Sequence, residues 1–359
     1  MVKLGKDRKK LIARDRWRFF YREVAIGFIL IFLLLLIPAF LVPLILGDTP
    51  ESPLYGLLFY SLKAILVFIG VPLTLTLSNI LFETQKTSLF MEEDISPAIG
   101  HLRLFKMTKK NYKYQILYGI LIFFLIFLPL DFFILLLVPG ILEYQAISVA
   151  FRVTDYYLLE NNYFIFLVSV IIIQFSVAIS EETIQRGLVT KRGSEQFFRM
   201  SAVLISALSF GLGHFAYFLD PISRLYPFWY PFIWFFQTFF AGIILALLVL
   251  RRKWLFPAIL AHALNNILAA HAFWSLLHGV NFSLIILYIY YPLLIIGSIL
   301  VVWYFSLIKS SLSIGLNMIK DYFKFDEKRE STKGDRIFRV LFDILMGILI
   351  FIMSFMIAI

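Results

Sequence analysis

Two adjacent glutamates and an arginine stand at the end of an apolar segment, at Glu181, Glu182 and Arg186. On a helix Glu182 and Arg186 lie four residues apart and can pair, which leaves Glu181 as a carboxylate without an obvious partner. Such a carboxylate suits general-base chemistry, in which it takes a proton from an attacking water. From this segment alone, a helix end with solvated charges is equally open.

Two later segments carry imidazoles at helical spacing. Phe210 and His214 share one helix face, and His262 and Asn266 share another, because residues four apart project the same way. Asn265 is predicted to fall off that second face. An imidazole beside a carboxylate makes a base, and an imidazole beside an amide makes a pair of hydrogen-bond donors.

The segments that hold these residues belong to a chain that requires lipid as its solvent. Of the 359 residues, 61% are apolar and only 16% are charged, whereas soluble domains carry roughly 45–50% and about 25%. There is no cysteine, which excludes disulfides, thiolate nucleophiles and cysteine-built zinc sites. The composition predicts an all-α, polytopic transmembrane helical bundle.

The number of spanning helices follows from the apolar runs, because a span needs about 20 such residues. We predict eight or nine, the third of which could break near Pro129. The first is predicted to be a retained anchor rather than a signal peptide. The nine candidates are Val24–Leu46, Leu54–Phe82, Gln115–Leu137, Tyr163–Ser180, Ala202–Phe218, Phe232–Leu250, Trp254–Trp274, Phe282–Ile308 and Ile337–Ile359.

Basic residues set the predicted orientation. Of the 33 Lys and Arg residues, nearly all fall before the first span or in alternate connectors, at 83–114, 181–201, 251–253 and 309–339. Cytoplasmic loops collect such residues, so we expect a multi-pass protein of the cell membrane (or of the endoplasmic reticulum in a eukaryote) with a cytoplasmic N-terminus. The net charge of +10 is thereby a topology signal and does not indicate a nucleic-acid partner.

Under this topology Glu181, His214 and His262 each lie about 14–18 Å from the basic end of their spans. Three separate spans therefore place polar groups in one layer of the bilayer. We expect them to converge on one wet pocket that opens toward the cytosol. In contrast, Lys63 and Asp131 are predicted to snorkel to the outer interface, and His271 and His278 are predicted to be structural or interfacial.

The three motifs, in this order, resemble those of the CPBP (CAAX protease and bacteriocin-processing, or Abi) family of membrane peptidases, which includes the Ras-converting CAAX endoprotease. The family pattern is Glu-Glu-x-x-x-Arg, Phe-x-x-x-His and His-x-x-x-Asn or Asp. It stands here as Glu181-Glu182…Arg186, Phe210…His214 and His262…Asn266, and the resemblance covers about a quarter of the chain.

The resemblance implies an intramembrane endopeptidase that acts on a membrane-associated protein or peptide near the cytoplasmic side. By analogy, Glu181 and His214 hold and deprotonate the attacking water, and His262 and Asn266 donate hydrogen bonds to the oxyanion. Glu182 and Arg186 orient and tune the site, with Phe210 as a supporting residue.

A metal-dependent mechanism is the rival for the same atoms. Glu181, His214 and His262 could hold Zn²⁺ with a bound water. A glutamate-based mechanism without a cofactor is the reading we favour. No His-Glu-x-x-His signature of zinc peptidases is present.

Two other functions remain open from the sequence. A relative that binds a membrane partner or confers bacteriocin immunity would keep the site without cleaving, and a proton-coupled transporter would use the same Glu and His as a relay. We expect four parts: a basic cytoplasmic segment (1–23), N-terminal transmembrane helices (24–160), a CPBP-like catalytic core (161–275) and C-terminal transmembrane helices (276–359).

Overall fold

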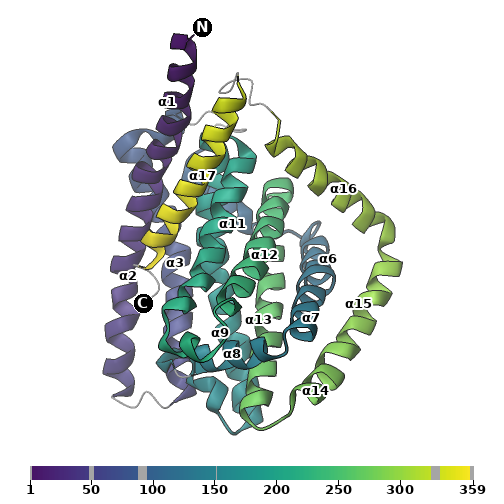
Figure 1. Ribbon diagram of the computed structural model, residues 1–359. Helices are drawn as coiled ribbons and strands as arrows, with labels where there is room; N and C mark the ends of the chain where they lie inside the picture. The colour runs from purple at the N-terminus through teal and green to yellow at the C-terminus, as the bar shows by residue number, and fades with distance from the viewer. Residues whose placement is uncertain (1, 48–51, 88–94, 151, 325–331, 356–359) are drawn as a thin grey trace.

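The computed structural model describes residues 2–47, 52–87, 95–150, 152–324 and 332–355. Within these ranges the chain is helical and contains no strand, which confirms the all-α prediction. Figure 1 shows long helices packed side by side, with the N-terminus at one end of the bundle.

Nine helices in the described part are long and apolar enough to cross a membrane, and each contains or closely overlaps a predicted span. They are Arg8–Leu46 within α1 (Val2–Phe19), η1 (Phe20–Val24) and α2 (Ala25–Leu46); α3 (Pro53–Phe82); α6 (Tyr112–Ile122), η3 (Phe123–Phe127) and α7 (Leu128–Leu137); α9 (Tyr163–Glu182), η5 (Thr183–Arg192) and α10 (Gly193–Gln196); α11 (Arg199–Phe215) and η6 (Ala216–Leu219); α12 (Tyr230–Arg252); α13 (Phe256–Leu277); α14 (Phe282–Ile285), η8 (Ile286–Tyr290) and α15 (Tyr291–Trp303); and α17 (Lys333–Ser354).

Shorter helices lie in the connectors. They are α4 (Thr84–Thr87), α5 (Pro97–Leu102), η2 (Arg103–Phe105), α8 (Gly140–Ala150), η4 (Val153–Leu159), η7 (Pro221–Leu225) and α16 (Phe305–Tyr322). The third span does not break at Pro129: a π-helical turn, η3, precedes the proline and α7 continues from it. A wide turn of this kind is one way in which a helix absorbs a local irregularity.

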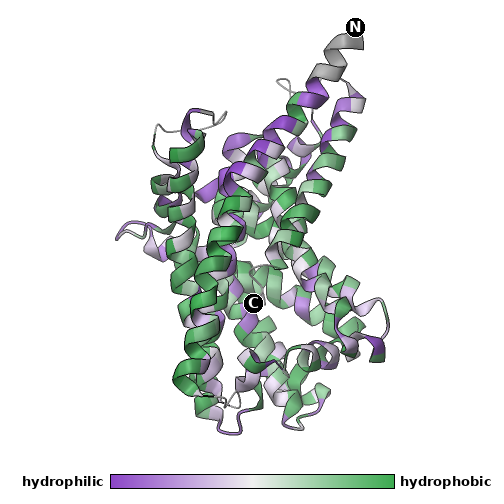
Figure 2. Ribbon diagram, turned by 90° about the vertical axis from the view of Figure 1, so that its left-hand side faces the viewer, coloured by the Kyte–Doolittle hydropathy of each residue, from purple (hydrophilic) through white to green (hydrophobic). Residues whose placement is uncertain are grey.

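The basic N-terminal segment is helical and runs into the first span without interruption. Arg16 is buried there, with Nε 2.5 Å from Asp343 Oδ1 of α17. The Tyr322 hydroxyl donates to the other oxygen of Asp343 at 3.1 Å. The first and last spans are therefore joined by a buried ion pair. Figure 2 shows hydrophilic residues gathered toward this end of the bundle and hydrophobic residues over its middle.

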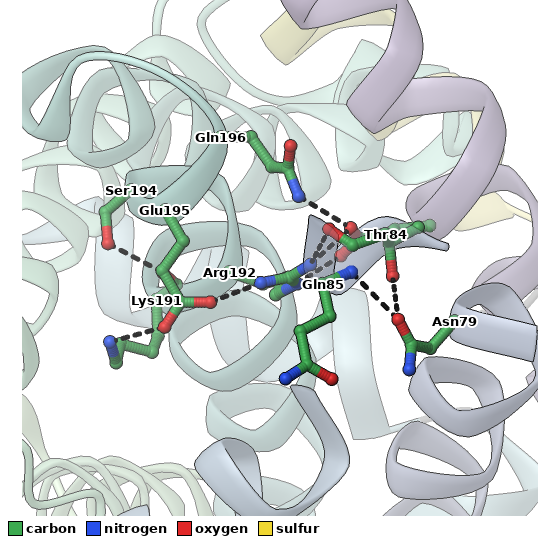
Figure 3. A network of polar contacts seen from close by, with 9 residues as sticks. Asn79, Thr84, Gln85, Lys191, Arg192, Ser194, Glu195 and Gln196 are labelled. Carbon is green, nitrogen blue, oxygen red and sulfur yellow. Dashed lines mark hydrogen bonds and ion pairs between the residues drawn. The ribbon is translucent and has the colours of Figure 1, made fainter. Parts of the chain in front are cut away.

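A second buried network joins the first span to the helix that carries the two glutamates. Arg192 donates to both oxygens of Glu23, at 2.7 and 2.9 Å, and to Glu195 at 2.5 Å. Gln196 also donates to Glu23, at 3.0 Å, and the Thr84 carbonyl accepts from Arg192 (Figure 3). These contacts fix the C-terminal end of η5 and α10 against η1 and α4.

Small residues let the central helices approach one another. A Cβ atom on Gly242 of α12 would lie 3.0 Å from the Ala207 Cα of α11, and one on Gly347 of α17 would lie 2.8 Å from a Leu208 methyl carbon. Close backbone approach at glycines is typical of helix packing in membranes. It holds α11, the helix of His214, between α12 and α17.

Candidate active site

The two glutamates lie where α9 changes into the π-helical segment η5. Asn162 caps the start of α9 by accepting from the Phe164 backbone N–H at 3.0 Å, and π-helical segments are frequent at functional sites. Arg186 Nε lies 3.1 Å from Glu182 Oε2, and both side chains are completely buried. The predicted pairing of Glu182 with Arg186 is confirmed.

His262 lies between the two glutamates. Its Nδ1 is 2.9 Å from Glu182 Oε1, and its Nε2 is 3.6 Å from Glu181 Oε2. Glu181 therefore has His262 of another span as a neighbour, although 3.6 Å is longer than a hydrogen bond. The Glu181 side chain is 41% exposed whereas that of Glu182 is 0% exposed. Glu181 is thus the carboxylate of the two that is open to the cavity.

His214 stands near the end of α11 and is oriented by its own helix. Its Nδ1 lies 3.2 Å from the Phe210 carbonyl oxygen. A carbonyl only accepts, so this contact places the proton of the neutral ring on Nδ1 and leaves Nε2 with a lone pair. The ring centroids of His214 and Trp234 are 5.6 Å apart, which further fixes the imidazole.

Phe210 connects the pieces of the site. Its ring centroid lies 5.2 Å from that of His214 and 5.7 Å from that of His262, and the Arg186 guanidinium carbon lies 4.4 Å from it. A cation over an aromatic face is attracted to it. Phe210 therefore packs against three of the predicted site residues at once.

The four predicted catalytic residues line one cavity of about 880 Å³. Glu181 comes from α9, His214 from α11, and His262 and Asn266 from α13. The structure thus brings together the three motifs that the sequence places on separate spans. Asn265 also lines this cavity, with its Oδ1 buried and lacking a hydrogen-bond partner among the described residues. Asn265, predicted to fall off the face of His262 and Asn266, thus lines the same cavity as they do.

Comparison with known proteins identifies the segment that holds this cluster. Residues 163–268 match the family model described as type II CAAX prenyl endopeptidase Rce1-like. These residues form an Rce1-like domain. No curated protein and no solved structure matches the chain. The match confirms the resemblance to the CPBP family, and the Rce1-like domain includes Glu181, His214, His262 and Asn266.

Several cavity residues lie outside the Rce1-like domain and were not predicted as part of a site. Lys63 of α3 and Asp131 of α7 line the cavity, so their predicted snorkelling to the interface was wrong. Asp131 is 7% exposed and accepts a hydrogen bond from Gln237. The available signal for Lys63 was its position about 15 Å into α3, a depth at which a polar group commonly faces a cavity.

The cavity also reaches polar residues of the connector before α9. Asp155 of η4 accepts from the Tyr60 hydroxyl at 3.3 Å, and Gln174 of α9 donates to the Tyr157 hydroxyl at 2.6 Å. Burial raises the pKa of Asp155 to about 6, against the lowering effect of Arg152. His271 and His278 lie apart from the cavity lining, bonded to Tyr163 and to the Trp274 carbonyl.

The direction of the cavity differs from our expectation. Its lining includes Arg152, Asp155 and Asp220, from connectors at the end of the bundle opposite the basic ones. Of the predicted basic connectors, that at 181–201 contributes only residues at its start (Glu181, Ile184 and Gln185), and the described residues of the connectors at 83–114, 251–253 and 309–339 contribute none. The opening toward the basic end that the sequence suggested is therefore not supported by this lining.

Glu181, His214 and His262 are the candidate ligands for a metal ion. In the part of the chain that the structure describes, no three His, Cys, Asp or Glu side chains are arranged to hold a metal ion. His262 presents Nδ1 to Glu182 and Nε2 to Glu181. Glu181, His214 and His262 thus do not form a preassembled metal site in the described residues, and we derive no step through a metal.

Proposed function

We propose that this multi-pass membrane protein is an intramembrane endopeptidase that hydrolyses a peptide bond of a membrane-associated substrate. The observation that carries the proposal is His262, which lies against both Glu181 and Glu182 at the wall of a cavity that His214 and Asn266 also line. A carboxylate, two imidazoles and an amide on one cavity are the parts that acyl transfer to water requires.

In this proposal Glu181 and His214 hold the attacking water. The water oxygen bonds to the scissile carbonyl carbon while its proton passes to Glu181, with Nε2 of His214 as the second acceptor. Both groups have a free lone pair in the geometry described above. General-base assistance of this kind contributes about 10²–10⁴-fold in rate.

His262 and Asn266 donate to the oxyanion that forms on the carbonyl oxygen. For His262 to donate through Nε2 while Nδ1 donates to Glu182, both ring nitrogens must carry protons. Nδ1 faces the Glu182 carboxylate, which accepts this hydrogen bond and is itself paired with Arg186. Collapse of the intermediate breaks the C–N bond, and the proton held by Glu181 passes to the leaving amine.

The substrate class is taken from the Rce1-like family, which is one of CAAX prenyl endopeptidases. We propose a membrane-anchored peptide that is cut close to its C-terminus, with membrane lipid as the surrounding partner.

The basic connectors are proposed to be cytoplasmic. Since the chain has no cysteine, a single cysteine at Lys110 or Arg224 can be labelled with a membrane-impermeant maleimide to show on which side of the membrane it lies. Labelling of Lys110→Cys from outside the cell would reverse the proposed orientation.

The activity is tested by incubating purified protein with a prenylated CAAX peptide and a panel of membrane proteins. Each reaction is run with and without a chelator, alongside Glu181→Gln. Cleavage that is lost in the variant and unaffected by the chelator supports the glutamate mechanism. Cleavage that survives Glu181→Gln removes the proposed base, and cleavage abolished by the chelator and restored by Zn²⁺ replaces it with the metal-dependent mechanism.

A further inference from the structure

Two cations share the cavity with the proposed catalytic residues. Lys63 and Arg152 both line it, and both lie outside the Rce1-like segment at 163–268. Lys63 lies within a span, where charged side chains are costly and by default mark function, whereas Arg152 comes from the connector before η4. Their positions relative to Glu181 and His214 show what they can bind.

The packing of α3 against α9 sets the level of Lys63. A Cβ on Gly56 would lie 3.4 Å from the Ile173 Cδ1. Further along, a Cβ on Gly27 would lie 3.2 Å from the side chain of Thr74 in α3 and 3.1 Å from that of Leu188 in η5, so Thr74 and Leu188 lie at one level. From the first pair (Gly56 and Ile173) to the second (Thr74 and Leu188) the residue numbers rise in both helices, so α3 runs parallel to α9 and η5. Lys63 lies seven residues after Gly56, and Ser180 lies seven residues after Ile173. An equal rise per residue therefore places Lys63 beside Ser180, within one turn of Glu181. Lys63 interacts electrostatically with Glu181 and Asp155.

Arg152 approaches the same space from the connector before α9. Its guanidinium carbon lies 4.4 Å from the centroid of the Tyr217 ring. It interacts electrostatically with Asp155 and with His214. Lys63 and Arg152 therefore flank the two proposed base residues, one from α3 and the other from the start of η4.

We propose that Lys63 and Arg152 form a subsite for the C-terminal carboxylate of the substrate peptide. The inference deepens the proposed function and rests on it, because a peptide cut close to its C-terminus leaves as a short fragment that carries a free carboxylate. A carboxylate in a cavity among apolar helices requires cationic donors. A fragment of three residues spans about 10 Å when extended, so one end can meet Glu181 and His214 while the other meets the cations.

The subsite is tested with two peptides that differ only at the C-terminus, one a free acid and the other the carboxamide. Wild-type protein is expected to prefer the acid by about 10–100-fold in KM, as hydrogen bonds to a charged group allow. Lys63→Met and Arg152→Gln are each expected to abolish most of that preference while leaving the kinetics of the carboxamide within about threefold. Lys110→Met and Arg224→Gln, which remove exposed cations that do not line the cavity, are expected to keep the full preference.

Two outcomes overturn the subsite. The first is a wild-type protein that treats acid and carboxamide alike. The second is an equal loss for both peptides in Lys63→Met and Arg152→Gln, which means that the cations only balance Asp155 and Glu181.

A binding measurement separates this failure from a failure of the proposed function. The two peptides, carrying a fluorophore, are titrated against wild-type protein in detergent and followed by anisotropy. Preferential binding of the acid without any cleavage retains the subsite and rejects the peptidase. Cleavage without preference retains the peptidase and rejects the subsite.

Discussion

His262 Nδ1 lies 2.9 Å from Glu182 Oε1, and the opposite nitrogen of the same ring lies 3.6 Å from Glu181 Oε2. One imidazole thus stands between a buried carboxylate that is already paired with Arg186 and a partly exposed carboxylate on the cavity wall. The two adjacent glutamates therefore differ: Glu182 holds the ring in place, and in the proposed reaction Glu181 faces the attacking water.

This difference predicts opposite profiles for two neighbouring variants. Glu181→Gln is expected to lower kcat by about 10²–10⁴-fold, because a general base is removed, while the thermal midpoint stays within a few degrees. Glu182→Gln is expected to lower the unfolding free energy by about 3–5 kcal/mol, because the Arg186 charge is left buried without its partner. Thermal unfolding in detergent and steady-state kinetics measure both, and a Glu182→Gln protein as stable as wild type would contradict the role of the pair.

The two asparagines of α13 allow a second comparison. Asn266→Ala is expected to reduce kcat by about 10²–10³-fold with little change in KM, as loss of an oxyanion donor does. Asn265→Ala is expected to reduce kcat by less than 10-fold, since its role in the proposed reaction is only to line the cavity. A larger kcat loss in Asn265→Ala than in Asn266→Ala would exchange their assignments.

The convergence of the motifs was predictable because intramembrane polar residues are few and their helical spacing is strict. Glu182 and Arg186 share a face at four residues apart, and so do His262 and Asn266. The same logic did not indicate that Asn265 also lines the cavity, because a wide cavity is lined by more than one row of a helix. It also failed for Lys63 and Asp131, since the span boundaries alone do not tell which side of a helix faces lipid.

Some features of the fold have no local signal in the sequence. The ion pair between Arg16 and Asp343 joins residues 327 positions apart, and no sequence pattern near either residue indicates its partner. The reach of the cavity toward Arg152 and Asp220 likewise depends on how connectors fold back over the bundle. Charge counts predict which connectors share a side, but they do not predict where a cavity opens.

Gly187 provides a third prediction. A Cβ at this position would lie 2.3 Å from the His101 Cε1 of α5, so α5 packs against η5 only because the residue is glycine. Gly187→Ala is expected to lower the thermal midpoint and kcat, although alanine normally stabilises a helix by roughly 0.5–1 kcal/mol. Gly315→Ala on α16, where no neighbouring atom lies within 4 Å of the added carbon, is the matched control and should be neutral or stabilising.

The double variant Gly187→Ala with His101→Ala tests whether that contact is the cause. Removing the imidazole makes room for the methyl group, so the two changes are expected to be non-additive, as they are for residues in contact. The double variant should be more stable than the sum of the single effects implies. Strict additivity would show that the loss in Gly187→Ala arises elsewhere in η5.

His101 also makes the fold sensitive to acid. It is 3% exposed, and burial lowers its pKa from 6.5 to about 4. Between these two values the unfolded chain binds a proton that the folded chain does not, so stability falls as the pH drops below about 6.5. At pH 5 the loss from this group alone comes to about 2 kcal/mol relative to pH 7.5.

His101→Gln removes this titration and retains a side chain of similar size. Thermal unfolding of wild type and variant in detergent at pH 5.0 and 7.5 gives four midpoints. The wild-type midpoint is expected to fall more between pH 7.5 and pH 5.0 than the variant's does. His278→Gln is the matched control, because the His278 imidazole bonds to the Trp274 carbonyl at 2.8 Å and lies away from α5. This variant should keep the acid sensitivity of wild type. Equal acid sensitivity in wild type and His101→Gln would show that His101 is charged in the folded protein, and α5 would then have to pack on η5 differently from the arrangement described above.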